Sequence, residues 1–525
     1  MVQHNTALVE EAFLLFLEDV KKYHPSYEVN DDTLFDYSAG SVDVEVVITG
    51  LADETNERYM LAMQMTGEVC SVKIIGASFY GARHGLETLS QLMAYDEFSN
   101  GFIMVSEGSI EDEPVYKYRG ITLDTARHFF NVQSIKNILD GMSYIKLNHF
   151  HWHLTDSNSF PFDSPSVPEM SKYGAHTTRQ IYTAENISDI VHYAKVRGIR
   201  IIPEIDAPAH AGYGWQWTEE NGKCKTVYCL AEEPWNKWCL QPPCGQLNPL
   251  CPDTYDILGY IYKDLYKLFP NDVYHMGGDE ISEKCWSDSS VAPETAEWLK
   301  TGSLLELWGG IFQKQAFDKL KEATENSTRK IILWESHLTK PDTIVRYLNK
   351  NDYIVHLWGS FNNSDYADLV NQGYEVIFAN NDKFYLDCGF GEFCDGGNNW
   401  CDPYKDWQTI YDTDPYQMLT DFGVDLDEII DPWNKRTRRD LVLGGSAALW
   451  TETVNEGTVE GKIFPRIGAL AERLWSNPAK GWKEGKATWR MATMTDRIAK
   501  RGIRADPIQP EWCLQNEGRC PPSTP

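Results

Sequence analysis

The sequence has no run of about twenty apolar residues, the length that a membrane-crossing helix needs. Residues 1–20 mix acidic with apolar side chains, which is typical of an amphipathic helix and not of a signal peptide. If the protein is exported, we expect that its leader has been removed. Cationic side chains are also few, 48 lysines and arginines against 77 aspartates and glutamates. This excess of negative charge argues against nucleic acid and anionic membrane surfaces as partners.

The cysteines lack the paired C-x2-C spacing of a zinc ribbon, although there are twelve of them. Most gather in three short segments: Cys224, Cys229, Cys239, Cys244 and Cys251; Cys388, Cys394 and Cys401; Cys513 and Cys520. Such clusters favour short surface disulfides in a protein of the secretory pathway. N-x-S/T tripeptides at Asn186, Asn326 and Asn362 agree with that compartment. We predict a secreted or lysosomal glycoprotein, and the cysteine pairing stays open.

The chain also lacks internal repeats and low-complexity tracts, but its pattern changes near Pro114. Before this point, residues 41–49, 60–65 and 72–75 have the character of strands, and residues 82–95 that of a helix. The acidic stretch that ends at Pro114 is typical of a boundary. We therefore predict a smaller N-terminal α/β domain over residues 1–115.

After the boundary, short β-rich runs recur, separated mostly by stretches long enough for a helix. The runs are residues 118–123, 147–154, 199–205, 272–276, 330–334, 353–358, 374–379 and 441–450. Eight such strands predict a closed (β/α)8 TIM barrel over residues 116–505, followed by a C-terminal tail at 506–525. The stretch 501–525 is expected to wrap the exterior of the barrel. The cysteine-rich stretch 207–271 is interpreted as a loop beside the site, with a helix from Asp253 onward. Residues 464–475 are also expected to be helical.

Acidic and tryptophan side chains follow the ends of several of these runs, where the catalytic groups of such barrels gather. The most informative segment is 275–280, which reads His-Met-Gly-Gly-Asp-Glu. Asp279 and Glu280 can serve one ligand only if the backbone departs from a regular strand, and Gly277 and Gly278 permit this. The alternative is a helix N-terminus, with Asp279 as its cap.

The 275–280 segment resembles the catalytic motif of the β-N-acetylhexosaminidases, family 20 of the glycoside hydrolases. Matching segments occur in order along essentially the whole chain, at residues 123–128, 151–157, 203–210, 384–387, 448–452 and 469–475. Residues 399–403 and 501–506 look especially like the arthropod members. The resemblance implies a catalytic (β/α)8 barrel preceded by a zincin-like α/β domain. Because the first domain has no H-E-x-x-H motif, we predict no metal there.

The resemblance also implies a mechanism in which the 2-acetamido oxygen of the substrate replaces the usual protein nucleophile. Glu280 would act as general acid and then as base, and Asp279 would orient the acetamido nitrogen. Tyr385 would donate its hydroxyl to the acetamido oxygen and hold the attacking geometry. Asp156 and His210 match a pair that modulates the acid. The alternative for this pair is a hydrogen bond with no kinetic role.

The remaining roles implied by the family concern sugar binding. The substrate-binding residues carried over are Arg127 and Glu452 for the 3- and 4-hydroxyls, Asp387 for the outer hydroxyls, Trp334, Trp358 and Trp450 for the walls of the acetyl pocket, and Trp400 for the next sugar. Each tryptophan has a core position as its alternative. For Arg127 the alternative is a structural ion pair with Asp124 or Glu452.

Two other classes of protein are alternatives: a metal-dependent amidohydrolase-type barrel and a non-catalytic carbohydrate-binding protein. His149, His151 and His153 alternate like the first metal ligands of an amidohydrolase barrel. We see nothing that completes such a metal site, so core and hydrogen-bonding roles are favoured. A non-catalytic carbohydrate-binding relative would usually have lost the acid, whereas this chain keeps Glu280.

The function that the resemblance implies is exo-β-N-acetylhexosaminidase activity with retention of configuration. The partner would be a carbohydrate with terminal β-linked N-acetylglucosamine, with N-acetylgalactosamine as a second candidate sugar. No cofactor and no metal are expected. The arthropod-like segments favour chitin oligosaccharides as substrate, and N-glycans or glycolipids are the alternative. Family members are often homodimers, so a homodimer is one candidate assembly, and the sequence leaves the oligomeric state open.

Overall fold

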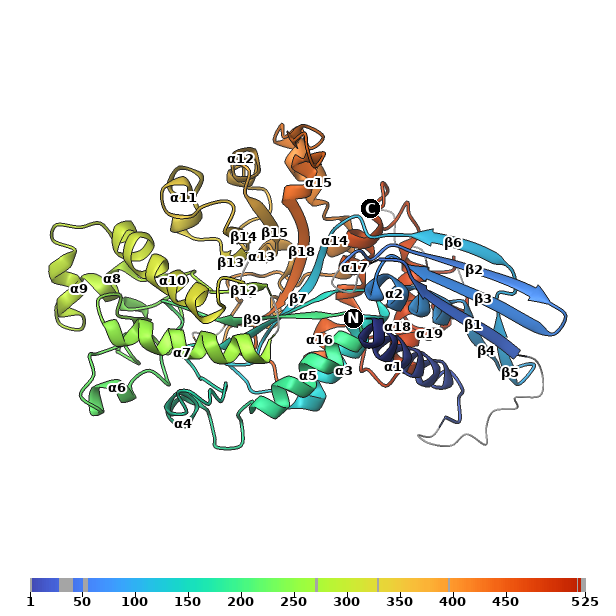
Figure 1. Ribbon diagram of the computed structural model, residues 1–525, viewed down its shortest axis with the longest axis horizontal. Coiled ribbons are helices and arrows are strands. Elements are labelled where there is room, and N and C mark those ends of the chain that lie inside the picture. Colours follow the sequence, from blue (N-terminus) through green and yellow to red (C-terminus); the bar gives the residue numbers. More distant parts are fainter. Residues whose placement is uncertain are drawn as a thin grey trace.

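The computed structural model describes residues 2–27, 41–50, 55–269, 272–327, 330–394, 397–516 and 518–520. Two bodies of structure follow each other along the chain, an open four-stranded sheet with helices and a closed barrel of eight strands (Figure 1). Within the described part, none of the helices combines the length and apolar character of a membrane span.

The first domain is built on a sheet with the strand order β1-β3-β2-β6. Its elements are α1 (Val2–Lys21), β1 (Ser41–Ile48), β2 (Tyr59–Thr66), β3 (Val69–Gly76), α2 (Phe79–Gln91), β4 (Met93–Asp96), β5 (Gly101–Met104) and β6 (Gly108–Asp112). In β2 the side chains of Tyr59, Leu61 and Met63 are buried while Met60 is exposed, so the strand is half-buried as its alternation predicts. The buried side chains pack with α1 and α2 into one apolar core.

The helix predicted over residues 82–95 is misplaced at both ends. Helix α2 begins after Ser78, whose hydroxyl accepts a hydrogen bond from the amide of Tyr80 at 3.1 Å. The helix ends at Gln91, and Tyr95 lies in β4, which pairs with β5. Apolar residues continue past the helix end without a glycine or proline, so the local sequence does not mark the change to a strand.

All eight strands predicted for the barrel are present, and the predicted fold is confirmed. They are β7 (Tyr118–Asp124), β8 (His149–Thr155), β9 (Arg200–Ile205), β12 (Val273–His275), β13 (Lys330–Trp334), β14 (Tyr353–Leu357), β15 (Glu375–Phe378) and β18 (Val442–Leu449). They pair in parallel and close between β9 and β12. At their N-terminal ends the barrel interior is filled by a layer that includes Ile202, Ile332, Ile354 and Ile377.

Helices cover the outside of the barrel (Figure 1). The helices that follow the first domain are α3 (Val132–Tyr144), α4 (Glu169–Gly174), α5 (Ala184–Val196), α6 (Trp217–Glu220), α7 (Pro252–Leu268), α8 (Glu283–Ser287), α9 (Pro293–Trp298), the π-helical η3 (Glu306–Gln313), α10 (Lys314–Ala323), α11 (Pro341–Tyr347), α12 (Asp365–Gln372), α13 (Asn381–Phe384), α14 (Trp407–Asp412), α15 (Pro415–Asp421), α16 (Val459–Ile463), α17 (Arg466–Ser476), α18 (Ala487–Lys500) and α19 (Glu511–Gln515). The helices predicted from Asp253 onward and over residues 464–475 correspond to α7 and α17.

The loops of the barrel carry short strands and most of the disulfides. The short elements are β10 (Val227–Tyr228), η2 (Trp235–Lys237), β11 (Gln246–Leu247), η4 (His337–Thr339), β16 (Ile429–Asp431), β17 (Arg436–Thr437) and η5 (Arg438–Leu441). The disulfides are Cys224–Cys251, Cys229–Cys285, Cys239–Cys244, Cys388–Cys401 and Cys513–Cys520. Cys229–Cys285 spans 56 residues and is buried, so the expectation of short surface bonds is wrong for this pair.

Buried ion pairs join the first domain to the barrel. Glu57 accepts hydrogen bonds from Arg119 of β7, from Nη2 at 2.7 Å and from Nη1 at 3.0 Å. Arg501 extends from the end of α18 to Glu87 of α2, with Nη2 2.8 Å from Oε1. The expectation that the chain from residue 501 onward wraps the barrel is therefore only partly met. Ile503 packs on the barrel core, whereas Arg501 binds the first domain.

Replacing Glu57 by glutamine is expected to destabilise the protein by about 3 kcal/mol, because the Arg119 guanidinium would be left buried without its counter-charge. The measurement is the midpoint of urea unfolding. Glu111→Gln is the matched control, since its ion pair with Arg58 is about half exposed and should contribute little. Equal shifts in the two variants would show that burial of the Glu57 pair has no special effect.

Candidate active site

The backbone after β12 leaves the strand conformation at once, as the two glycines predict. The φ angles of Gly277 and Gly278 are +66° and +93°, and Glu280 has φ +49°. A Cβ at Gly277 would lie 1.7 Å from Oδ1 of Asp206, so only glycine fits there. Positive φ at a glutamate is a strained conformation of the kind that collects at functional sites. The alternative of a helix cap at Asp279 is wrong, because Ser282 caps the next helix, α8.

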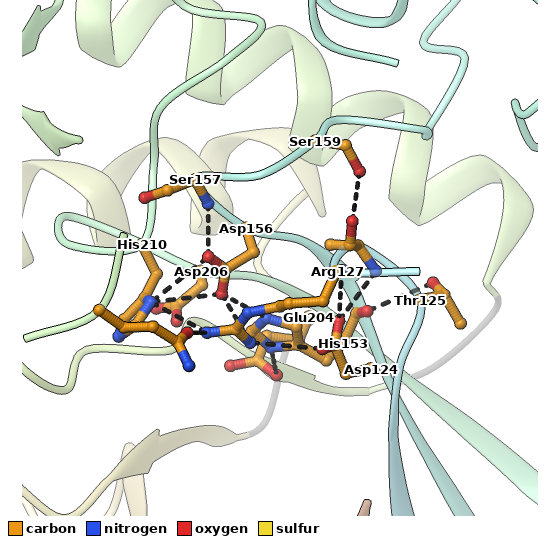
Figure 2. Close-up of polar contacts among 12 residues, drawn as sticks. Asp124, Thr125, Arg127, His153, Asp156, Ser157, Ser159, Glu204, Asp206 and His210 are labelled. Atoms are coloured by element: carbon orange, nitrogen blue, oxygen red, sulfur yellow. Dashed lines mark hydrogen bonds and ion pairs between the residues drawn. The ribbon is translucent and has the colours of Figure 1, made fainter. Parts of the chain in front are cut away.

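A chain of polar contacts runs from Glu280 to the ends of two other strands. Figure 2 shows the part of this chain formed by His210, Asp156 and Arg127. Oε2 of Glu280 lies 3.1 Å from Nε2 of His210. Nδ1 of His210 lies 3.3 Å from Oδ2 of Asp156, which follows β8. The same oxygen of Asp156 lies 2.9 Å from Nη1 of Arg127, which follows β7. The structure thus brings together four of the residues selected from the sequence.

The charges of His210, Asp156 and Arg127 alternate along this chain. Burial disfavours a cationic imidazole, yet Asp156 and Glu280 together raise the pKa of His210 well above its usual range. Burial also opposes ionisation of Asp156, but Arg127 and His210 hold the pKa of its carboxyl well below the usual range. At neutral pH, Glu280 therefore faces an imidazolium whose charge is balanced by Asp156.

Asp279 is buried beside a second carboxyl group, that of Asp206. Burial, together with the Glu280 carboxylate and despite the nearby His210, raises the pKa of Asp279 to about 6. Burial and Asp279 raise the pKa of Asp206 well above its usual range, so Asp206 is the member of the pair that keeps its proton. Asp206 was not among the selected site residues. Its place in the segment 203–210 was the available signal.

Arg127 and Glu452 are linked through the side chain of Gln241. The closest approach of their charged atoms is 4.0 Å, and Gln241 lies between them. Gln241 Oε1 accepts a hydrogen bond from Arg127 Nη2 at 2.7 Å, and its Nε2 donates to Oε1 of Glu452 at 2.7 Å. Arg127 also forms an ion pair with Asp156. The structure is therefore compatible with a structural ion pair and with a role of Arg127 in ligand binding. Sequence reasoning missed Gln241, whose only signal was the short Cys239–Cys244 loop that holds it.

Aromatic side chains wall the site. The ring of Trp450 has its centroid 6.2 Å from that of Tyr385 and lies 5.2 Å under the Arg127 guanidinium. Trp358 and Trp400 meet edge to face at 6.1 Å, and Trp400 is 62% exposed. This exposure rules out the alternative of a core position for Trp400 and leaves its face open to a ligand.

These residues enclose a cavity of about 370 Å³, which is the size of a small-ligand site. Its lining consists of Arg127, His153, Asp156, Asp206, His210, Trp235, Leu240, Gln241, Pro242, Asp279, Glu280, Trp358, Tyr385, Glu392, Phe393, Cys394, Trp400, Trp450 and Glu452. Two selected residues are outside the lining. Trp334 is buried beneath it, with its ring 5.9 Å from Trp450. Asp387 is buried beside the Cys388–Cys401 disulfide, and burial with Glu452 raises the pKa of Asp387 to about 8.

The histidines of the barrel interior do not have the geometry of a metal site. Nitrogens of His151, His275 and His356 lie within 4.8 Å of one another. However, the rings of His151 and His275 are stacked, with 4.3 Å between centroids and 20° between planes. A metal ion lies in the plane of each imidazole that binds it, so stacked rings cannot converge on one ion. Nδ1 of His275 already accepts a hydrogen bond from the amide of Gly277. The arrangement therefore supports the hydrogen-bonding interpretation.

The site lies at the C-terminal ends of the barrel strands, where the active sites of TIM barrels are found. Two neighbouring acidic side chains, one of them in contact with an imidazolium, face a cavity with aromatic walls. Most glycoside hydrolases use a pair of carboxyl groups beside the glycosidic bond, one of which protonates the leaving oxygen. The fold and the site thus define this class.

The chain belongs to glycosyl hydrolase family 20, because the catalytic domain of that family matches residues 116–478. It is therefore a β-N-acetylhexosaminidase, a glycosidase of a family that uses the acetamido group of its substrate in catalysis.

Several known proteins are similar over most of the chain. The chitooligosaccharidolytic beta-N-acetylglucosaminidase of Ostrinia furnacalis is 42% identical, over 89% of this chain and 75% of the relative. A probable beta-hexosaminidase of Drosophila melanogaster is 37% identical, over 91% of this chain and 70% of the relative. The crystal structure of a GH20 exo beta-N-acetylglucosaminidase from Vibrio harveyi in complex with N-acetylglucosamine has a TM-score of 0.72 at 25% identity, covering 95% of this chain and 73% of that one.

Proposed function

We propose that this protein removes terminal β-linked N-acetylglucosamine, and also N-acetylgalactosamine, from the non-reducing ends of chitin oligosaccharides with retention of configuration. The observation that carries the proposal is the contact of Glu280 with the His210–Asp156 pair, beside Asp279, in a cavity whose lining also includes Arg127, Gln241 and Glu452.

In this proposal Glu280 protonates the glycosidic oxygen, and the 2-acetamido oxygen attacks the anomeric carbon to form an oxazolinium ion. Asp279, as a carboxylate, holds the acetamido N–H and stabilises the positive charge that develops. Tyr385, whose pKa is raised by burial, keeps its proton and donates it in a hydrogen bond to the acetamido oxygen. Glu280 then takes a proton from the water that opens the oxazolinium.

The other contacts of the sugar are also proposals. Trp358 and Trp450 enclose the acetyl group, and buried Trp334 supports Trp450 from beneath. Arg127 and Glu452 bind the 3- and 4-hydroxyls, which requires that Gln241 shares or yields its two hydrogen bonds. Asp387, held by the Cys388–Cys401 disulfide, serves the outer hydroxyls, and the exposed face of Trp400 stacks on the second sugar.

Product profiling tests the substrate. Chitin oligomers labelled at the reducing end should shorten by one sugar at a time, because the proposed enzyme acts on the terminal non-reducing residue. A biantennary N-glycan with terminal N-acetylglucosamine is digested in parallel. Release from the glycan alone would contradict the chitin preference, and internal fragments of the oligomer would contradict exo action. The first sugar released should be the β-anomer.

We also propose a cellular compartment and an assembly for this protein. The described disulfides, together with exposed Asn326 and Asn362 in N-x-S/T tripeptides, support a place in the secretory pathway, either secreted or lysosomal. A homodimer is proposed from the resemblance to the family.

A further inference from the structure

Glu204 is a buried carboxylate that the mechanism above does not use. It lies in β9, is fully buried, and is drawn beneath the Arg127–Asp156 contact in Figure 2. Its two oxygens have different partners. Oε1 accepts a hydrogen bond from the indole Nε1 of Trp334 at 2.8 Å. Oε2 lies 2.7 Å from Nδ1 of His153 and 2.8 Å from Nε2 of His151. Oε1 also lies 3.2 Å from Nδ1 of His275. An ionised carboxylate is costly to bury without such partners.

The His153 branch leads to the acid. The ring of His153 bridges two carboxylates, because its Nε2 lies 3.0 Å from Oδ2 of Asp156 while Nδ1 faces Glu204. Burial opposes a charge on His153, yet Glu204 and Asp156 raise its pKa well above the usual range. Both ring nitrogens therefore donate, and the imidazolium fixes the position of Asp156. Asp156 in turn contacts His210, which contacts Glu280.

The Trp334 branch leads to the acetyl pocket. The hydrogen bond to Glu204 helps to fix the rotation of the Trp334 indole, which also stacks on His356 at 4.1 Å and 14° and contacts the ring of His275. Trp334 then meets the ring of Trp450, which lines the cavity. A rotation of Trp334 would change the support of that wall.

We propose that Glu204 is a positioning residue that serves both halves of the reaction centre, with His153 as its link to the acid Glu280 and Trp334 as its link to the acetyl pocket. The inference rests on the proposed role of Glu280. The Glu204 carboxylate thereby holds Glu280 and the acetyl pocket in fixed positions relative to each other, although it does not touch the substrate.

Three variants separate the two branches. His153→Asn should lower kcat about 100-fold for chitobiose, which needs its leaving group protonated, and less than about tenfold for the nitrophenyl glycoside. Its preference for N-acetyl over N-propionyl substrates should not change. Trp334→Phe removes the N–H donor and should lower that preference about tenfold while leaving the leaving-group dependence unchanged. Glu204→Gln should show both effects.

His149→Asn is the matched control. His149 lies four residues before His153 on the same strand, where its ring stacks on Tyr118, and the variant should leave both readouts unchanged. Circular dichroism shows whether Glu204→Gln folds. If it does not fold, His153→Asn and Trp334→Phe still test the proposal. Equal losses of His153→Asn on both leaving groups, or an unchanged N-acyl preference in Trp334→Phe, would overturn the proposal. Glu280→Gln is measured beside them. If it too lacks leaving-group dependence, the role of Glu280 is at fault and not the inference.

Discussion

Replacing Glu280 by glutamine should lower kcat about 1,000-fold for chitobiose, the substrate whose leaving group is a sugar hydroxyl. A sugar alkoxide is a poor leaving group and must receive a proton as the glycosidic bond breaks. Glutamine keeps the size of the side chain and can still contact His210, but it has no proton to give. A nitrophenolate leaves without a proton, so the aryl glycoside should lose far less of its rate in this step. The measurement is steady-state kcat on both substrates.

Glu283→Gln provides the matched control for this variant. Glu283 is three residues further along, is exposed at the start of α8, and has no contact with the His210–Asp156 pair. Its kinetics should equal those of the unaltered enzyme. A Glu280→Gln variant that loses the same factor on both substrates would mean that Glu280 positions the sugar and does not protonate the leaving group.

Much of the fold could be predicted because barrel strands are local features of the sequence. Each buried run of β-branched residues marks its own strand, as residues 330–334 do for β13. The site could be located for a related reason, since side chains at the ends of parallel strands meet at one face of the barrel. Gly277 and Gly278 also predicted the departure from strand conformation, with positive φ angles, that lets Asp279 and Glu280 line one cavity.

What could not be predicted depends on contacts between distant segments. Gln241 gains its position between Arg127 and Glu452 from the fold of a loop more than a hundred residues from Arg127. The end of α2 is set by the pairing of β4 with β5, which outweighs the helical pattern of the local sequence. The proton kept by Asp206 arises from burial against Asp279, a property of two strand ends together. Local periodicity carries no information about such pairs.

Replacing Asp279 by asparagine should lower kcat for N-acetylglucosaminides about 100-fold to 1,000-fold, because the oxazolinium-like transition state would lose its neighbouring negative charge. The pH profile gives a more specific result. Burial raises the pKa of Asp279 to about 6, and its role requires the ionised form. In the unaltered enzyme the acidic limb of kcat/KM should therefore have its midpoint near pH 6, with a fall of about tenfold per unit below it. In Asp279→Asn there is no carboxyl to titrate, so this acidic limb should disappear.

Asp206→Asn distinguishes the charge of Asp279 from a general effect of the buried pair. Asp206 keeps its proton near neutral pH, and its Oδ1 accepts a hydrogen bond from the amide of Gly278 at 3.1 Å. Asparagine preserves that acceptor and exchanges one neutral group for another, so most activity and the limb near pH 6 should remain. Loss of the limb in Asp206→Asn with its retention in Asp279→Asn would reverse the assignment, making Asp206 the carboxylate that supports the acetamido group.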